Sequence, residues 1–387
     1  MTDMHITMLL TNPFRPDPRV HKEARSLTRA GYRVTVICWD RQGEFPPLEQ
    51  IDGFEVRRLV VPSGYGVGSR QALYLPRFWL LALKELYRLR PDIIHCHDLD
   101  TTPAGYWYAR THRLPWLFDA HEAYPEATVE LRVNRLIYHL LVWLERFMTR
   151  RASHVITVGN LIAQRFQAMG GRVSVVGNYQ PLQPVDRHLV VTRADLGLPA
   201  DAYVVAYIGG FNRARAIVPL MEATTYAHDV TVLLVGDGPQ RPDIEARLPQ
   251  YPRVRYLGWV PQAQVPDYTR LADVIYYGLL GDDLNNHYSS PNALFNALMA
   301  GRPLITTNIG EVARIVQTGQ CGLVLESPTP QAIANAIDQL RDRFRRETMA
   351  TNARRAAETT YNWAAAEAVL LKIYRNLIPT PVSRQVS

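Results

Sequence analysis

A histidine flanked by carboxyl groups is the first candidate for chemistry in this chain. It lies in residues 118–122 (FDAHE), where Asp119 and Glu122 stand within two positions of His121. An apolar stretch precedes the run, so we expect it to end a buried strand. A histidine beside carboxylates can position or deprotonate a hydroxyl group, which makes His121 and Glu122 candidate catalytic residues. A turn histidine with satisfied hydrogen bonds is the alternative interpretation.

A second run of residues resembles a metal-binding cluster and consists of His95, Cys96, His97 and Asp98. Alternate residues of a strand face the same side, so Cys96 should point away from both histidines. Zinc sites normally draw their ligands to one side of the chain. We therefore expect no metal site here.

A third candidate is an anion site at the start of a helix within residues 287–303 (HYSSPNALFNALMAGRP). Ser290 suits the N-cap, Pro291 the first helical position and Gly301 the position that ends the helix. The free amides of Asn292 and Ala293, with the helix dipole, could then bind an anion. An ordinary capped helix that packs into the core is the alternative.

Two glycine turns follow expected strands and could bring the backbone close to a ligand. In residues 208–215 (IGGFNRAR), Gly209 and Gly210 precede Arg213 and Arg215, which could neutralise a phosphate. The three-glycine fingerprint of dinucleotide sites is absent. The second turn, residues 235–239 with Gly236, could equally be a plain turn.

These candidates need elements to position them, and short apolar runs alternate with amphipathic stretches along the whole chain. We expect strands at 5–10, 34–39, 92–97, 116–121 and 154–158, with helices near 19–30, 71–90, 101–111, 131–151 and 160–169. A second series of strands is expected at 203–208, 230–235, 254–257, 274–277, 304–307 and 322–325. This alternation is typical of parallel sheets with right-handed crossovers. It predicts an α/β protein with two doubly wound Rossmann-like domains that face each other across a cleft, where ligands would bind at the strand ends.

The expected domain limits follow from composition. Residues 176–184 (VGNYQPLQP) are the best candidate linker. We expect an N-terminal domain over 1–180, a second domain over 181–360, a C-terminal helix over 361–378 and a frayed tail over 379–387.

The charge of the 387-residue chain is +7 and is unevenly distributed. Residues 1–185 hold 23 Lys and Arg against 17 Asp and Glu, whereas residues 186–387 hold 20 against 19. A basic half suits an anionic membrane, a phosphorylated acceptor or nucleic acid. We expect no nucleic-acid partner, because the arginines are dispersed and no binding module is recognisable.

The remaining composition favours a reducing compartment. The cysteines are Cys38, Cys96 and Cys321, an odd and widely spaced set. Neither a signal peptide nor a membrane-spanning run is evident, so a cytoplasmic location is expected. Residues 132–151 place Leu136, Leu140 and Trp143 at helical spacing beside several arginines. A core helix is the default for this stretch, and a membrane-surface helix is the alternative.

Over nearly its whole length the chain resembles the retaining GT-B glycosyltransferases of family 4 (group 1). The first half matches at residues 17–24 (DPRVHKEA), 91–98 (PDIIHCHD) and 119–122 (DAHE). The second half matches at residues 209–210, 236–239, 257–260 and 290–303. Residues 361–363 (YNW) resemble the start of the family's last helix, which crosses back to the first domain.

The resemblance implies retaining, hexosyltransferase-type transfer from a nucleotide-diphosphate sugar to a glycan or lipid-linked acceptor. It also implies a role in cell-surface polysaccharide or glycolipid synthesis, weak attachment to an anionic membrane, and no cofactor or metal. His121 matches the histidine at the junction of donor and acceptor. The implied donor-binding residues are Gly209, Gly210, Arg213, Arg215, Gly236, Tyr256, Leu257, Val260, Ser290, Pro291, Asn292, Ala293 and Asn296. The implied acceptor-side residues are Arg19, Lys22, His97 and Asp98.

Three positions depart from the family pattern. The paired glutamates of the family fall on Tyr288 and Asn296, and a usual lysine falls on Ala293. Asn296 could accept one hydrogen bond from a ribose hydroxyl, but without the charge of a glutamate. A non-catalytic nucleotide-sugar-binding or scaffolding protein is therefore the alternative to an active enzyme.

Overall fold

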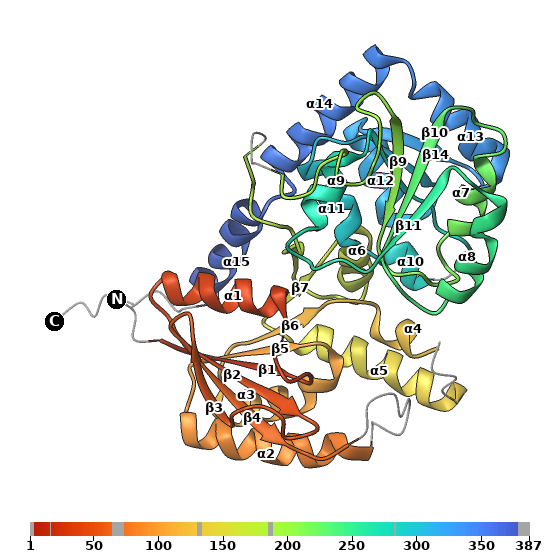
Figure 1. The fold of residues 1–387 in the computed structure, drawn as a ribbon. Coiled ribbons are helices and arrows are strands. Elements are labelled where there is room, and N and C mark those ends of the chain that lie inside the picture. The colour runs from red at the N-terminus through yellow and green to blue at the C-terminus, as the bar shows by residue number, and fades with distance from the viewer. Residues whose placement is uncertain are drawn as a thin grey trace. The chain divides into compact units, whose positions relative to one another are not determined.

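The computed structural model describes residues 4–15, 17–63, 73–129, 134–184, 189–281 and 284–377. The chain divides into two compact units, shown as ribbons in Figure 1. Unit 1 comprises Met1–Gly177 and Ala366–Ser387, and unit 2 comprises Asn178–Ala365. The tail expected at 379–387 lies outside the described residues.

Unit 1 is built on an eight-stranded sheet with the order β3-β4-β2-β1-β5-β6-β7-β8. All its neighbouring strands are parallel except the β3–β4 pair, which is antiparallel. The central strands are fully buried, as a sheet covered on both faces requires. The strands are β1 (His5–Leu10), β2 (Arg33–Asp40), β3 (Leu48–Ile51), β4 (Phe54–Val60), β5 (Ile93–His97), β6 (Trp116–Ala120), β7 (His154–Thr157) and β8 (Val173–Val175).

The helices of unit 1 cover both faces of this sheet. Figure 1 shows α1 (Pro18–Arg29) and α15 (Trp363–Leu377) on one face and α2 (Leu75–Leu89) and α3 (Thr102–His112) on the other. Helix α1 begins where Asp17 accepts a hydrogen bond from the Val20 amide, with Pro18 at its first position. The remaining elements are η2 (Leu99–Thr101), α4 (Tyr124–Val129), α5 (Arg135–Arg151) and α6 (Asn160–Ala168).

Strands β3, β4 and β8 and helix α4 were not predicted from the sequence. In β4 (FEVRRLV), charged residues interrupt the apolar ones, so the run lacks the appearance of a buried strand. A usable signal does exist between β3 and β4. Asp52 and Gly53 both adopt positive φ, at 47° and 88°, as the Asp-Gly turn of a hairpin requires.

Unit 2 is built on a six-stranded parallel sheet with the order β11-β10-β9-β12-β13-β14. Its strands confirm the second predicted series, except that β11 ends one residue later. They are β9 (Tyr203–Ile208), β10 (Val230–Val235), β11 (Val254–Gly258), β12 (Val274–Tyr277), β13 (Leu304–Thr307) and β14 (Gly322–Leu325).

The helices of unit 2 alternate with these strands. They are α7 (Ile217–Ala223), α8 (Arg241–Arg247), η3 (Leu248–Gln250), α9 (Val265–Leu271), α10 (Leu284–Tyr288), α11 (Asn292–Met299), α12 (Gly310–Gly319), α13 (Pro330–Gln339) and α14 (Arg343–Thr359). The predicted pair of doubly wound α/β domains is therefore confirmed. Within the described residues, no helix is both long enough and apolar enough to cross a lipid bilayer.

Candidate functional site

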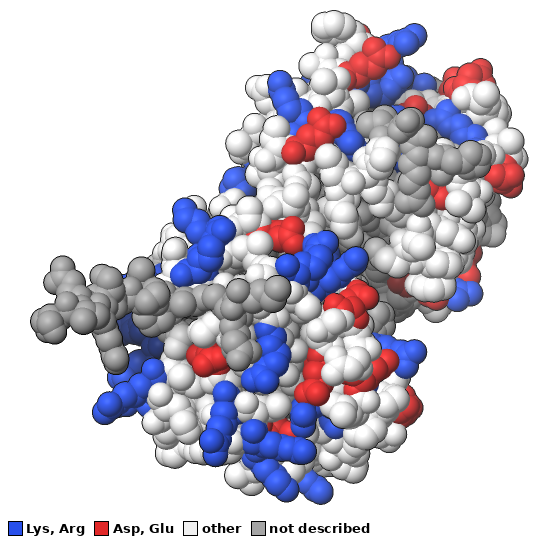
Figure 2. All heavy atoms as spheres, turned by 90° about the vertical axis from the view of Figure 1, so that its left-hand side faces the viewer, with Lys and Arg blue, Asp and Glu red and all other residues white. Residues whose placement is uncertain are grey.

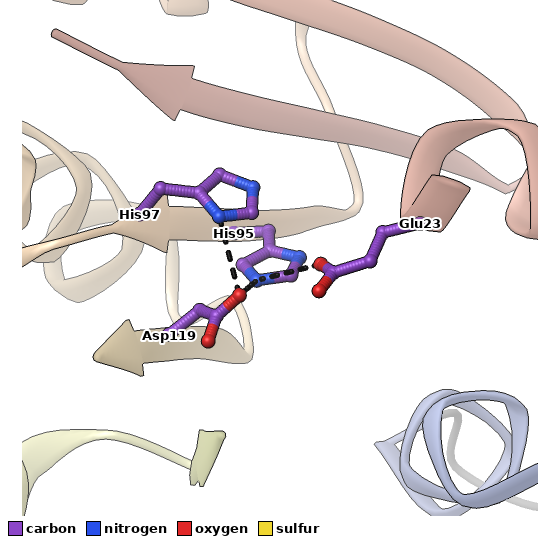
Figure 3. Close-up of side chains that lie close together, drawn as sticks. All are labelled: Glu23, His95, His97 and Asp119. Atoms are coloured by element: carbon purple, nitrogen blue, oxygen red, sulfur yellow. Dashed lines mark ion pairs between the residues drawn. The ribbon is translucent and has the colours of Figure 1, made fainter. Parts of the chain in front are cut away.

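In unit 1, ionisable side chains from three separate segments converge at the carboxyl ends of β5 and β6. Figure 3 shows His95 and His97 on β5, Asp119 on β6 and Glu23 on α1. Strands β5 and β6 are paired with His97 opposite Asp119, so the sheet register brings these side chains together. His121 follows β6 directly and joins the same group.

The centre of this cluster is an ion pair between Arg19 of α1 and Asp119. Arg19 Nη2 lies 2.7 Å from Asp119 Oδ1 and 3.0 Å from Oδ2, and 3.2 Å from Glu23 Oε1. Arg19 Nη1 donates to the Val176 carbonyl at 2.7 Å. All three side chains are buried, so the charges of Arg19 and Asp119 interact at a low local dielectric.

His121 is enclosed by two carboxylates. Its Nε2 lies 3.2 Å from Asp119 Oδ2 and its Nδ1 lies 3.4 Å from Asp98 Oδ2. Burial opposes a charge on this ring, but Asp98 and Asp119 outweigh burial and raise the pKa of His121 to about 9. The ring is therefore a cation at neutral pH, a form that can position a hydroxyl group but has no lone pair with which to deprotonate one.

The two histidines of β5 behave in the opposite way. Burial, with His95 next in size, lowers the pKa of His97 to about 3, and burial also lowers the pKa of His95. His95 Nδ1 lies 2.7 Å from the hydroxyl of Tyr374 on α15, and the two imidazole rings stack at 4.2 Å. Both rings are therefore neutral parts of the packed cluster.

Glu23, His95, His97 and Asp119 each offer an atom that could ligate a metal ion, and these atoms lie within 4.8 Å of one another. Arg19, however, already contacts both carboxylates with a permanent positive charge. A cation placed between the same oxygens would face that guanidinium directly. We therefore interpret the cluster as an ion-pair network.

The predicted acceptor-side residues divide into two kinds. Arg19 and His97 are buried within the cluster. Lys22 and Asp98 are partly accessible. Burial, and then Arg19, lowers the pKa of Lys22 to about 8. Glu122, predicted beside His121 as catalytic, is exposed.

Unit 2 contains a cavity of about 450 Å³ that opens at the carboxyl ends of β9, β10 and β12. This is the edge at which doubly wound sheets bind ligands. Nine of the predicted donor residues line it: Gly209, Gly210, Arg215, Gly236, Val260, Pro291, Asn292, Ala293 and Asn296. Arg213, Tyr256, Leu257 and Ser290, which were also predicted, are not among its lining residues.

Further lining residues were not singled out from the sequence. They include Asn212, Asp237, Trp259, Gln262, Val265 and Tyr277. Trp259 lies inside residues 257–260, a segment that carried the family resemblance. Its place in that segment could have marked Trp259 as a cavity residue. Among the described lining residues, only Arg215 and Asp237 are charged, so the cavity is close to neutral overall.

Arg215 is held in a defined orientation. Its Nη1 donates to Asn286 Oδ1 of α10 at 2.8 Å, and its guanidinium carbon lies 5.1 Å from the centroid of the Tyr277 ring. Arg213, two residues earlier, is exposed and outside the cavity. Of these two arginines, the structure directs Arg215 to the cavity.

The glycine turns have a steric reason at Gly236. This residue has φ of 142°, and a Cβ at its position would overlap the carbonyl oxygen of Gly209. The loops after β9 and β10 can therefore touch only because residue 236 has no side chain. That contact shapes the cavity wall.

The start of α11 differs from the prediction. Pro291, with φ −71° and ψ 145°, is the N-cap, and the helix begins at Asn292. The Pro291 carbonyl accepts from the Leu294 amide at 3.1 Å, whereas Ser290 Oγ is buried without a hydrogen-bond partner among the described residues. An extended Pro291 places the amides of Asn292 and Ala293 in the first turn, at the cavity wall. Gly301 follows the last turn at φ 60°, as predicted.

Asn296, which stands at a family glutamate position, forms a wall between two cavities. It lines the cavity just described and also a neighbouring cavity of about 470 Å³, and Gln262 is shared in the same way. Only 8% of Asn296 is exposed. A carboxamide at this depth can exchange hydrogen bonds with a ligand but adds no charge.

Comparison with known proteins places the two units in one family. The description "Glycosyl transferase 4-like domain" matches residues 16–178, and "Glycosyl transferases group 1" matches residues 202–343. Among solved structures, sucrose-phosphate synthase from Thermosynechococcus elongatus has a TM-score of 0.79 at 21% identity and covers 97% of this chain and 99% of its own. HepE from Anabaena, solved in complex with UDP-glucose, has a TM-score of 0.71 at 17% identity over 96% of this chain and 100% of its own.

Curated relatives are also glycosyltransferases. The alpha-D-kanosaminyltransferase of Streptomyces kanamyceticus is 25% identical over 77% of this chain and 81% of its own length. The putative teichuronic acid biosynthesis glycosyltransferase TuaC of Bacillus subtilis is 24% identical over 87% and 88%. The lipopolysaccharide core biosynthesis glycosyltransferase LpsD of Rhizobium meliloti is 29% identical over 44% of this chain and 47% of that protein.

The fold and these likenesses define a glycosyltransferase of the GT-B type. The chain belongs to the family that combines a glycosyl transferase 4-like domain with a group 1 domain, which confirms the resemblance seen in the sequence.

Proposed function

We propose that this enzyme transfers a sugar, with retention of anomeric configuration, from a nucleotide-diphosphate sugar to a glycan or lipid-linked acceptor in cell-surface polysaccharide or glycolipid synthesis. One observation carries the proposal. The unit 2 cavity brings together Arg215, the glycines of the turns after β9 and β10, and the first amides of α11, at the carboxyl ends of the strands. The names of LpsD and TuaC support the polysaccharide assignment, and the UDP-glucose complex of HepE supports the donor class.

Each part of the cavity suits one part of such a donor. The diphosphate is assigned to Arg215 and the amides of Asn292 and Ala293, because a guanidinium and a helix N-terminus both favour anions. Gly209 and Gly236 let the backbone approach it closely. The base and ribose are assigned to the wall formed by Trp259, Val260 and Asn296.

The chemistry then depends on stabilising the diphosphate as it leaves. Arg215 and the α11 amides are oriented before the substrate binds, which is the arrangement that lowers the energy of developing charge. We assign the proton of the acceptor hydroxyl to an oxygen of the leaving diphosphate, on the same face as the attack. Neither a metal ion nor a cofactor is part of this proposal.

The alternative function is a non-catalytic nucleotide-sugar-binding or scaffolding protein. Tyr288, Ala293 and Asn296 favour it, since each replaces a charged side chain of the family pattern. The near-neutral cavity is in keeping with either function. The two functions differ in turnover and share donor binding.

A donor screen separates the two functions. The full chain is incubated with a panel of nucleotide sugars, with and without membrane extracts as acceptor, while calorimetry measures binding and mass spectrometry follows the released nucleotide. Transfer from one donor, with the same anomeric configuration in the product as in the donor, supports the retaining enzyme. Binding without turnover in any extract supports the alternative, and absence of binding contradicts both.

We further propose that unit 1 attaches weakly to an anionic membrane through α5. Only Glu145, Met148 and Thr149 of this helix are buried, so the default expectation of a core helix is corrected. Leu136 is 77% and Trp143 59% exposed. Glu145 points inward instead, where Arg165 binds it at 2.6 Å.

The apolar side chains of α5 are accompanied by cations. Ile137 and Leu140 are also exposed, and so are Arg135, Arg146, Arg150 and Arg151. An amphipathic helix with this combination binds the interface of anionic lipid. Figure 2 views the side of the molecule that is on the left in Figure 1. On that side, Lys and Arg side chains are spread over the surface of unit 1, in keeping with the basic charge of the first half of the chain.

A further inference from the structure

We propose that His121 acts as a fixed imidazolium, oriented by Asp119, Asp98 and Arg19 as positioning residues, and that it does not deprotonate the acceptor. The proposal deepens the proposed function and rests on it for the identity of the substrate. The geometry of the described cluster carries it.

The first step is the surroundings of the His121 ring. Nε2 lies 3.2 Å from Asp119 Oδ2 and Nδ1 lies 3.4 Å from Asp98 Oδ2. An ionised carboxylate oxygen has no proton to donate, so each ring nitrogen that faces one must carry the proton. Burial raises the pKa of Asp98, and the charge and amide of His121 oppose that rise. A ring with a proton on both nitrogens is a cation and has no lone pair with which to accept another.

The second step is that Asp119 stays ionised although it is buried. Burial opposes its charge, yet Arg19, the next largest influence, and His121 hold the pKa of Asp119 well below its usual range. Arg19 contacts both carboxylate oxygens, at 2.7 and 3.0 Å. The permanent charge of Arg19 therefore keeps Asp119 available as the anion that His121 needs.

The third step is the role of Asp98. This residue has φ of 61°, a backbone region that non-glycine residues seldom adopt. Its amide donates to the Asp119 carbonyl at 2.8 Å, and its Oδ1 accepts from the His121 amide at 3.1 Å. Strain of this kind persists where surrounding contacts over-determine it, and here they bind the loops after β5 and β6 together around His121.

The remaining groups of the cluster fit a cationic His121. His97 Nδ1 lies 3.2 Å from His121 Nε2 and also 3.2 Å from Asp119 Oδ2, and burial keeps His97 neutral. Glu23 lies 3.2 Å from Arg19 and 3.9 Å from His95 Nε2. The charges that face His121 are thus Asp98, Asp119 and Arg19, and the two carboxylates prevail.

The side chain of His121 is 22% exposed, so its charge can act on a ligand at the surface of unit 1. A ring with a proton on both nitrogens supplies such a ligand with positive charge and hydrogen-bond donors and cannot act as a base. In the proposed reaction that proton goes to the leaving diphosphate, so His121 contributes charge and orientation.

Nitrogen NMR of the full chain labelled with ¹⁵N-histidine tests the charge without any substrate. His121→Gln identifies the His121 signals by their loss. We expect both ring nitrogens of His121 to show protonated shifts across neutral pH, with titration near pH 9. One unprotonated nitrogen at neutral pH would overturn the proposal even if the enzyme transfers sugar normally.

Asp98→Asn tests the positioning role and leaves the buried Arg19–Asp119 pair in place. Removing one carboxylate should lower the titration point of His121 by about one to three pH units. The transfer rate of this variant should fall with rising pH at the same new midpoint. Arg25→Gln, on the exposed side of α1, is the control and should leave the titration unchanged. An unshifted titration in Asp98→Asn contradicts the role of Asp98, whereas absent transfer in the wild type contradicts only the proposed function.

Discussion

The two units treat charge in opposite ways. In unit 1, buried ionisable groups satisfy one another, with Arg19, Asp119 and His121 in direct contact. In unit 2, the cavity presents one arginine, one aspartate and a set of backbone amides to solvent. The buried charges of Arg19 and Asp119 therefore neutralise each other and leave the partly exposed His121 to act on a ligand, whereas the cavity of unit 2 keeps its charges for a ligand.

This contrast predicts different consequences of substitution. Removing one member of a buried ion pair leaves an uncompensated charge and destabilises the fold. Removing a charged side chain that lines a ligand cavity weakens ligand binding and leaves the stability of the fold almost unchanged. The predictions below use this difference, beginning with the largest effect.

Asp119→Ala should lower the free energy of unfolding of unit 1 by about 3–5 kcal/mol, because it leaves Arg19 buried without its main partner. Denaturant titration followed by circular dichroism measures the loss. Asp237→Ala is the matched control, since Asp237 is 43% exposed on the cavity rim and forms an exposed ion pair with Arg241 at 3.3 Å. Equal losses in the two variants would remove the contrast.

Arg215→Ala should weaken the binding of a nucleoside diphosphate by one to two decades, the equivalent of about 1.5–3 kcal/mol for a hydrogen bond to a charged group. Calorimetry measures the affinity, and an unchanged melting temperature shows that the fold is intact. Arg213→Ala is the control, because Arg213 is exposed outside the cavity and its loss should change little. If Arg213 proves the more important residue, the donor position is wrong.

Trp143→Ser should reduce binding to vesicles of phosphatidylglycerol roughly tenfold, because the indole supplies much of the apolar contact of α5. Co-sedimentation at low and high salt measures binding, and salt should weaken it for the wild type. Phe344→Ser is the control, since Phe344 is 81% exposed on α14 of unit 2. Equal binding by wild type and Trp143→Ser would remove the membrane role of α5.

Glu23→Gln should change the pH dependence of stability, which is the smallest effect. Burial, with Asp119 next, raises the pKa of Glu23 from its ordinary 4.5 to about 8. Between these values the folded chain holds a proton that the unfolded chain releases, so stability falls as pH rises. Thermal melts at about pH 6 and about pH 8 should differ less for Glu23→Gln than for the wild type. The same difference in both proteins would show that Glu23 is ionised in the folded state.

The sequence predicted the strands of unit 2 well because each is a short β-branched run between helices. It did not predict β4, whose Glu55, Arg57 and Arg58 interrupt the apolar pattern and find partners only in the folded unit. The spacing of apolar residues along the chain shows which face of a helix or strand is buried, but it does not show ion pairs between residues far apart in the sequence. The hairpin of β3 and β4 was missed for that reason.

The candidate sites show the same limit. Family motifs located nine lining residues of the unit 2 cavity, yet they did not assign Trp259 and Tyr277, which also line it. Arg19, far from Asp119 in sequence, was expected on the acceptor side, and its ion pair with Asp119 depends on the placement of α1 beside β6, which no local motif contains. The charge of His121 depends on that arrangement, so a motif alone could not establish it.

Hydrogen–deuterium exchange of the full chain, with and without a nucleotide-diphosphate sugar, tests the central claim most directly. The claim is that the donor is held in the unit 2 cavity by a prepared set of backbone amides and Arg215. The account predicts slower exchange in peptides covering residues 208–215, 235–237 and 291–296, with the effect lost in Arg215→Ala. Slower exchange confined to the cluster of unit 1, or no change with any donor, would contradict it.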